Sequence, residues 1–122
     1  MDVFEIKEVQ DYMVFVVGGA YQGKTEYVRE NFGEEYRIIP DYQLVVRRQL
    51  QEGLEPLEQW RVYSQELEDK VVIISQDLGS GLVPMDPFER MYREQLGRVN
   101  CLIAKDSCEV IRVVCGVGTK IK

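Results

Sequence analysis

Short runs of consecutive apolar residues alternate along the chain with longer stretches in which apolar residues recur at helical spacing. The clearest of these runs, Met13–Val17, is continuous and typical of a strand buried on both faces. Lys70–Ser75 predicts a second buried strand, and Glu109–Gly116 predicts a third central strand. A shorter run over Tyr36–Ile39 is followed by Pro40, which favours a strand that ends there. The closing residues 119–122 predict a returning edge strand. Residues 1–12 form a possible N-terminal extension, in which Val3–Val9 predicts a further edge strand.

Helical periodicity fills the intervals between these strands. Residues 44–67 are predicted to be helical, and Gly53 and Pro56 divide them into two pieces. The apolar positions of that interval are Leu44, Leu50, Leu54 and Leu57. The longest predicted helix follows Asp86 and Pro87, which form an N-cap and first-turn pair. Its apolar positions are Phe88, Met91, Tyr92, Leu96, Val99 and Ile103.

The alternation of strands and helices predicts an α/β fold, a mostly parallel sheet flanked by helices. A chain of 122 residues, 45% of them hydrophobic, can bury one core and is too short for two independent domains, so we expect a single domain. The formal net charge of −6 disfavours nucleic acid and anionic membrane surfaces as partners. No apolar run approaches the roughly 20 residues of a membrane span, and the acidic N-terminal segment is unlike a signal peptide. We therefore expect a cytoplasmic protein.

The chain has three cysteines and no histidine. Cys101, Cys108 and Cys115 show neither a disulfide framework nor C-x-x-C metal spacing, so we expect buried, reduced thiols and no zinc site. The absence of histidine removes the commonest general base and any phospho- or nucleotidyl-histidine intermediate. Chemistry in this protein must therefore use other side chains.

The stretch GGAYQGKT, residues 18–25, fits the phosphate-loop pattern G-x-x-x-x-G-K-[ST] between a buried strand and a predicted helix. Its glycines allow successive backbone N–H groups to converge on phosphate oxygens at the positive end of the helix. Lys24 would reach the β- and γ-phosphates of ATP or GTP, and the Thr25 hydroxyl would contact Mg²⁺. A turn that binds nothing is the alternative, but it would not need a lysine followed by a hydroxyl. The predicted nucleotide-binding residues are Gly18, Gly19, Ala20, Tyr21, Gln22, Gly23, Lys24 and Thr25.

Two aspartates follow predicted strands, at the carboxyl ends where α/β folds bind ligands. Asp41 and Asp77 are therefore candidate catalytic residues beside Lys24, and Asp77 is the preferred Mg²⁺ contact, directly or through water. Either aspartate could instead be a helix N-cap or turn residue. Asp77 leads into a second glycine loop, whose candidate site residues are Gly79, Gly81 and Pro84. Arg90 and Arg93 share a face of the following helix and are candidate phosphate contacts, with a solvated helix surface as the alternative.

These residues also carry a resemblance to a known family. GGAYQGKT and the block from Gln76 to Lys120 resemble the bifunctional adenosylcobinamide kinase/adenosylcobinamide-phosphate guanylyltransferase family of cobalamin synthesis. The family block reads approximately Asn-Glu-Val-Gly-x-Gly-Ile-Val-Pro, then an arginine-rich helix ending Gly-Arg-x-Asn, an Asp-Glu-Val strand and a Gly-x-x-x-x-Lys finish. The matching residues here are Gln76–Pro84, Arg90, Arg93, Gly97–Asn100, Ala104, Glu109, Val110, Gly116 and Lys120.

The resemblance implies a RecA-like P-loop sheet in a homotrimer that phosphorylates the aminopropanol hydroxyl of adenosylcobinamide and then transfers GMP to that phosphate. This chain is shorter than the family between its first helix and Asp77, and it lacks the histidine that carries GMP in the family, so we expect the guanylyltransferase step to be lost. Residues 41–44 stand loosely in place of the family's metal-associated Asp-Cys-Leu-Thr stretch. Two functions remain open: a kinase of the cobinamide type, or a non-catalytic nucleotide- or corrinoid-binding homologue acting as a regulator or partner.

Overall fold

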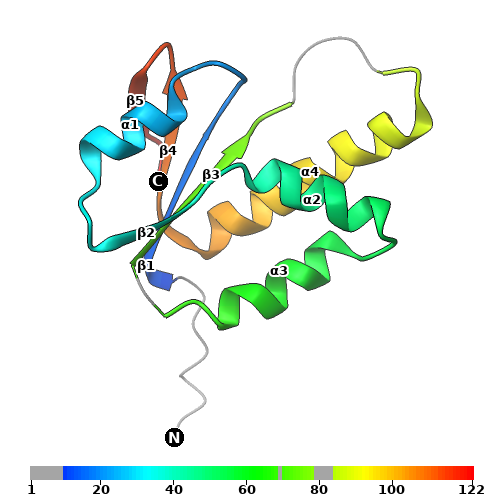
Figure 1. The fold of residues 1–122 in the computed structure, drawn as a ribbon, viewed down its shortest axis with the longest axis horizontal. Helices are drawn as coiled ribbons and strands as arrows, with labels where there is room; N and C mark the ends of the chain where they lie inside the picture. Colours follow the sequence, from blue (N-terminus) through cyan, green and yellow to red (C-terminus); the bar gives the residue numbers. More distant parts are fainter. Residues whose placement is uncertain (1–9, 69, 79–83) are drawn as a thin grey trace, which may run out of the picture.

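A computed structural model describes residues 10–68, 70–78 and 84–122, which form a five-stranded sheet with helices on both faces (Figure 1). The strands are β1 (Gln10–Gly18), β2 (Tyr36–Ile39), β3 (Lys70–Gln76), β4 (Ser107–Val114) and β5 (Val117–Lys120). Their order across the sheet is β2-β3-β1-β4-β5, and only β5 runs antiparallel to its neighbour. The predicted α/β fold with a mostly parallel sheet is confirmed.

The described helices are α1 (Lys24–Asn31), α2 (Tyr42–Gln51), α3 (Pro56–Gln65) and α4 (Pro87–Asp106). The predicted division of residues 44–67 is confirmed, because Gly53 has a φ of 78° between α2 and α3, and Pro56 occupies the first turn of α3. The predicted start of α4 is also confirmed. The Asp86 carboxylate accepts a hydrogen bond of 2.8 Å from the backbone N–H of Phe88, as an N-cap residue should.

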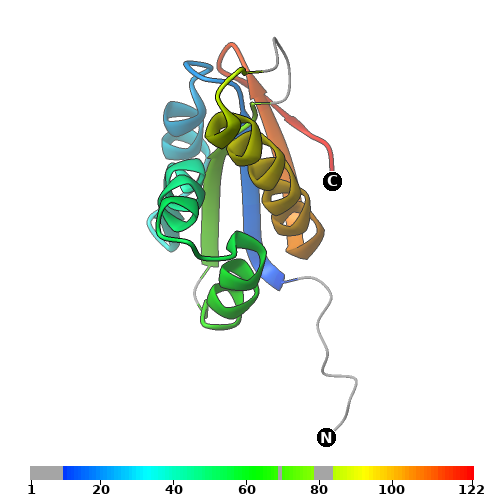
Figure 2. The ribbon, with the colours of Figure 1, turned by 90° about the vertical axis from the view of Figure 1, so that its right-hand side faces the viewer.

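The sheet separates two hydrophobic layers, because successive residues of its central strands point to opposite faces. Val14 and Val16 of β1 pack with Val28 of α1 on one face. Met13 and Phe15 face the opposite layer, which α2, α3 and α4 cover (Figures 1 and 2). Both faces are covered, and this explains why the central strands β1 and β3 contain continuous apolar runs in the sequence.

Contacts between α2 and α4 fix the start of α2, where a predicted site residue lies. Arg47 of α2 donates two hydrogen bonds, of 3.1 and 2.5 Å, to the carboxylate of Glu89 on α4. Its guanidinium also lies 5.0 Å from the centre of the Tyr92 ring. The Tyr92 hydroxyl in turn donates to the backbone carbonyl of Gln43 at 2.8 Å. These contacts hold α2 against the first two turns of α4 and so fix the position of the N-terminus of α2, which Asp41 precedes.

The prediction of buried cysteines is wrong, since Cys101, Cys108 and Cys115 are all free and exposed. On α4 the buried face passes through Val99 and Ile103, and helical spacing turns Cys101 away from it. Cys108 occupies an exposed position of β4, and Cys115 lies in the turn between β4 and β5. Cysteine's general tendency to be buried is overridden here by the register of each element.

Further expectations concern the two ends of the chain, one loop and the absence of a membrane-spanning segment. The predicted strand over Val3–Val9 lies outside the described residues, as do Gly79 and Gly81 of the second glycine loop. The edge strand expected at residues 119–122 exists as β5, but it begins at Val117 and ends at Lys120, so residues 121–122 lie outside it. No helix among the described residues has the length and apolar character needed to span a membrane.

Candidate functional site

The phosphate loop joins β1 to α1 at the carboxyl end of the sheet, in the strand–loop–helix arrangement that its sequence pattern requires. Gly18 ends β1, and Gly23 is the N-cap residue of α1 with a φ of 85°, a left-handed conformation that favours glycine. A cavity of about 440 Å³ opens beside the loop. The described residues that line it are Ala20, Tyr21, Gln22, Gly23, Lys24, Thr25, Glu26, Asp41 and Gln76. We refer to this space as the phosphate cavity; binding of a nucleotide in it stays a prediction.

Lys24 and Asp41 both line the phosphate cavity. The Nζ of Lys24 donates to the Gly19 carbonyl at 2.6 Å, so the side chain folds back over its own loop. Burial lowers the pKa of Lys24, while the negative charge of Asp41 acts in the opposite direction. Asp41 precedes α2 at the N-cap position with a left-handed φ of 52°, yet its carboxylate makes no capping hydrogen bond and instead accepts one of 3.4 Å from the Gln43 side chain. The geometry therefore favours a role in the cavity over a role as a helix cap.

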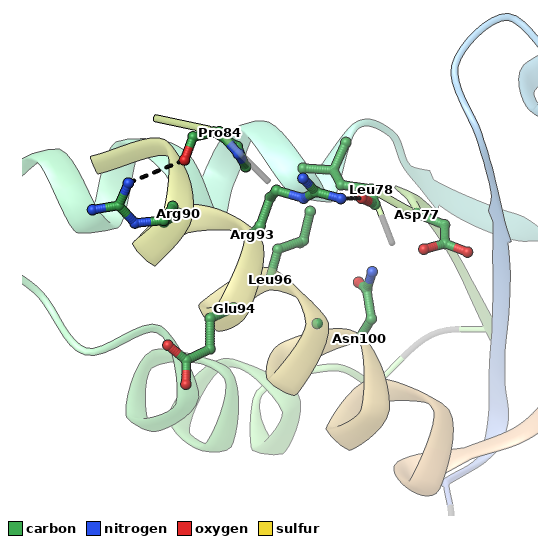
Figure 3. Close-up of a pocket in the computed structure, with 9 residues that line it drawn as sticks. Asp77, Leu78, Pro84, Arg90, Arg93, Glu94, Leu96 and Asn100 are labelled. Carbon is green, nitrogen blue, oxygen red and sulfur yellow. Dashed lines mark hydrogen bonds between the residues drawn. The ribbon is translucent and has the colours of Figure 1, made fainter. Parts of the chain in front are cut away.

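Asp77 follows β3 on the other side of the loop. Its backbone N–H donates to the Gly18 carbonyl at 2.9 Å, which ties the end of β3 to the start of the phosphate loop. Its side chain lines a second cavity of about 410 Å³, whose described lining residues are Asp77, Leu78, Pro84, Arg90, Arg93, Glu94, Leu96, Gly97 and Asn100 (Figure 3). We call this the α4 cavity. Gln76 lines the phosphate cavity and Asp77 the α4 cavity, so the end of β3 lies between the two.

The two predicted phosphate-contacting arginines lie at the α4 cavity and are not among the described residues that line the phosphate cavity. Arg90 donates to the carbonyls of Pro84 and Met85 at 3.1 and 2.7 Å and points away from Asp77 (Figure 3). Arg93 donates to the Leu78 carbonyl at 2.9 Å, so its guanidinium lies at the same end of the cavity as Asp77. Of the two, Arg93 is the better placed to meet a ligand in the α4 cavity.

Asn100 and Gly97 were present in the Gly-Arg-x-Asn pattern, but the sequence alone assigned them no role. The Asn100 side chain accepts a hydrogen bond of 2.9 Å from the Ser75 hydroxyl and donates one of 3.2 Å to the Gln76 carbonyl. Asn100 therefore joins α4 to the end of β3, immediately before Asp77. Gly97 lies on the wall of the α4 cavity, and a Cβ there would have no described residue within 4 Å. The packing of the described part of the chain therefore does not require glycine at this position.

Comparisons with known proteins agree with the resemblance seen in the sequence. The chain is 43% identical over 53 residues to the "Bifunctional adenosylcobalamin biosynthesis protein CobU" of Salmonella typhimurium, and equally to that of Escherichia coli. The aligned segment makes up 43% of this chain and 29% of each relative, so the match spans less than a third of those proteins.

A family model described as "Cobinamide kinase / cobinamide phosphate guanyltransferase" matches residues 41–121. The match begins after the phosphate loop, whose assignment therefore rests on its own sequence pattern and geometry. It includes Asp41, Asp77 and the described wall of the α4 cavity. Because the matched segment is well over half of the chain, this protein belongs to the cobinamide kinase / cobinamide phosphate guanyltransferase family.

Proposed function

We propose that this protein is a kinase that binds ATP or GTP with Mg²⁺ in the phosphate cavity and phosphorylates a hydroxyl group of a cobinamide in cobalamin biosynthesis. The observation that carries the proposal is the position of the α4 cavity, directly across the end of β3 from a phosphate loop. A donor and an acceptor can therefore approach one strand end from two sides. The family description, which names cobinamide kinase, supplies the class of acceptor.

The phosphate loop would hold the nucleotide by its backbone N–H groups and by one cation. The backbone N–H groups at the N-terminus of α1 form the positive end of the helix dipole, which is where phosphate oxygens bind. Lys24 would exchange the Gly19 carbonyl for the β- and γ-phosphate oxygens. The positive charge of Lys24 would then stabilise the negative charge that develops on the transferred phosphoryl group.

The oxygen atoms at the loop fit Mg²⁺. The Thr25 hydroxyl and the Asp41 carboxylate both line the phosphate cavity, and Mg²⁺ prefers such oxygen ligands while keeping several waters and binding substrate phosphates. Among the described residues no group of three acidic or cysteine side chains forms a complete metal site. A divalent ion here would therefore depend on the nucleotide for part of its shell. When bound, it would neutralise charge on the phosphate oxygens. The sequence favoured Asp77 as the Mg²⁺ contact. We propose Asp41 instead, because Asp41 lines the phosphate cavity together with Thr25, whereas Asp77 lines the α4 cavity.

The α4 cavity would receive the hydroxyl-bearing arm of the acceptor. Leu78, Pro84 and Leu96 offer apolar surface, while Asp77 and Asn100 offer polar groups at one end. Asp77 would accept the hydroxyl proton as the acceptor oxygen forms its bond to the γ-phosphorus and the bond from that phosphorus to the β–γ bridging oxygen breaks. The products are a phosphate ester and the nucleoside diphosphate.

The guanylyl-transfer half of the family description is not proposed for this chain. That step, as the resemblance implies it, uses a covalent GMP–histidine intermediate, and the 122 residues contain no histidine. The same observation favours a second candidate function, a nucleotide- or corrinoid-binding homologue without catalysis. Such a protein would act as a regulator or partner, in the homo-oligomer that the family resemblance implies.

Calorimetric titration with ATP and with GTP in Mg²⁺, followed by adenosylcobinamide and a mass spectrum of the corrinoid, tests the proposal. A corrinoid that gains the mass of one phosphate supports the kinase. Bound nucleotide with an unmodified corrinoid supports the binding homologue. Lys24→Ala should abolish nucleotide binding, whereas Lys105→Ala, at an exposed position of α4, should not. Nucleotide binding that survives Lys24→Ala would contradict the phosphate-loop assignment.

A further inference from the structure

The turn between β4 and β5 lies directly against the phosphate loop, although the two segments are far apart in sequence. The Gln22 side-chain oxygen accepts a hydrogen bond of 2.6 Å from the backbone N–H of Cys115. The Gln22 backbone carbonyl accepts a second, of 2.7 Å, from the N–H of Gly116. Gln22 thus accepts hydrogen bonds from both backbone N–H groups of a two-residue turn.

The conformation of this turn makes those two N–H groups available. Cys115 and Gly116 both have positive φ angles, 51° and 79°, and they connect the paired residues Val114 and Val117. This is the left-handed pair of a two-residue hairpin turn that suits the twist of its strands. A backbone N–H can bond only to an acceptor, so the contact with Cys115 fixes the amide of Gln22 with Oε1 toward the turn and Nε2 away from it.

Close backbone approaches flank these hydrogen bonds. A Cβ on Gly23 would lie 3.2 Å from the Gly116 Cα, and a Cβ on Gly18 would lie 2.5 Å from the Val113 carbonyl oxygen. Side chains at the two ends of the loop would therefore separate it from the hairpin. The β4–β5 hairpin and the phosphate loop are packed backbone against backbone, which only glycines permit.

We propose that Gln22 is a positioning residue of the nucleotide site, and that Gln22 with the β4–β5 turn forms a brace that holds the phosphate loop in its binding conformation before the nucleotide arrives. The inference rests on the proposed nucleotide binding and concerns how the site is prepared. A loop that is already ordered loses less conformational entropy when the ligand binds. The brace therefore raises the affinity for nucleotide even though the β4–β5 turn does not contact the phosphates.

The test compares dissociation constants for ATP and GTP in Mg²⁺, measured by calorimetry well below each protein's unfolding midpoint. Gln22→Met keeps the length of the side chain and removes its oxygen acceptor, so Kd should rise about three- to tenfold. Gln22→Ala should weaken binding at least as much. Because alanine has no sulfur, this second variant shows whether the change in Kd comes from the lost oxygen and not from the methionine sulfur. Gln65→Met, at an exposed position at the end of α3, is the matched control and should leave Kd unchanged.

The unfolding temperature of each variant, measured beside its Kd, separates positioning from packing. A merely structural role for Gln22 would lower the unfolding temperature of Gln22→Met and leave its Kd within twofold of the wild-type value; that result overturns the inference. Absence of binding by the wild-type protein would contradict the proposed function itself, and the positioning role with it.

Discussion

At the scale of single residues, two opposing effects act on the pKa of Lys24. Burial lowers its pKa and Asp41 opposes that shift. A triphosphate binds the protonated amine, so affinity must fall as the amine loses its proton. Because the pKa in the folded protein lies below the ordinary value of 10.5, this loss begins at a lower pH than a solvent-exposed lysine would show. We predict an alkaline limb in nucleotide binding below pH 10.5.

Asp41→Asn should move that alkaline limb to lower pH, because it removes the charge that favours the protonated amine. Calorimetry between about pH 7 and pH 10 would locate the limb in each protein. Glu26→Gln is the matched control, since Glu26 also lines the phosphate cavity but is not among the groups that shift the pKa of Lys24. Limbs at the same pH in wild type and Asp41→Asn would contradict this account of Lys24.

The roles of Asp41 and Asp77 also show what a sequence leaves open at this scale. Both follow strands, so each could be assigned to the carboxyl edge of the sheet in advance. Which of two neighbouring cavities each would line depends on how α2 and α4 fold back over that edge. Likewise, the phosphate pattern predicted Gln22 as a loop residue, but its hydrogen bond to Cys115 joins segments with no local relation in sequence.

At the scale of elements, α4 carries a glycine that its own packing does not explain. Gly97 lies within the helix, where glycine is less favourable than alanine by about 1 kcal/mol. A Cβ there would lie in the wall of the α4 cavity with no described residue within 4 Å. We predict that Gly97→Ala stabilises the protein by about 0.5–1 kcal/mol in urea unfolding and slows phosphorylation of cobinamide, while ATP affinity stays unchanged.

A second alanine on the same helix provides the control for this prediction. Cys101→Ala changes an exposed position of α4 that does not line the α4 cavity, so it should leave phosphorylation unaffected. A Gly97→Ala protein that is more stable and phosphorylates cobinamide at the wild-type rate would show that the added methyl group does not contact the bound cobinamide. The glycine would then need another explanation.

Most elements were predictable because their signals are local. Apolar runs marked the central strands β1 and β3, and Gly53, Pro56 and the Asp86–Pro87 pair marked helix boundaries through their own backbone preferences. The buried face of α2 was less predictable. Leu44 is 56% exposed, while Tyr42 and Val46 are buried, because α2 is oriented by its contacts with α4 rather than by the positions of its leucines.

At the scale of the whole molecule, the proposed site joins parts of the chain that are far apart. The phosphate loop precedes the segment that matches the family, whereas Asp77, α4 and the β4–β5 turn lie within it. Hydrogen bonds from Asp77 and Gly116 to the two ends of the loop connect these parts. Binding of a nucleotide should therefore stabilise the fold as a unit and not the loop alone.

This coupling predicts how thermal stability responds to two ligands. ATP with Mg²⁺ at about one hundred times its Kd should stabilise the folded state by about 2.7 kcal/mol, which raises the unfolding temperature by about 8–16 °C for a chain of this length. Lys24→Ala should remove this increase. Adenosylcobinamide should raise the unfolding temperature of Lys24→Ala as much as that of the wild type, because its proposed cavity lies across β3 from Lys24. If both ligands lose their effect in that variant, they share one site, and the assignment of separate donor and acceptor cavities is wrong.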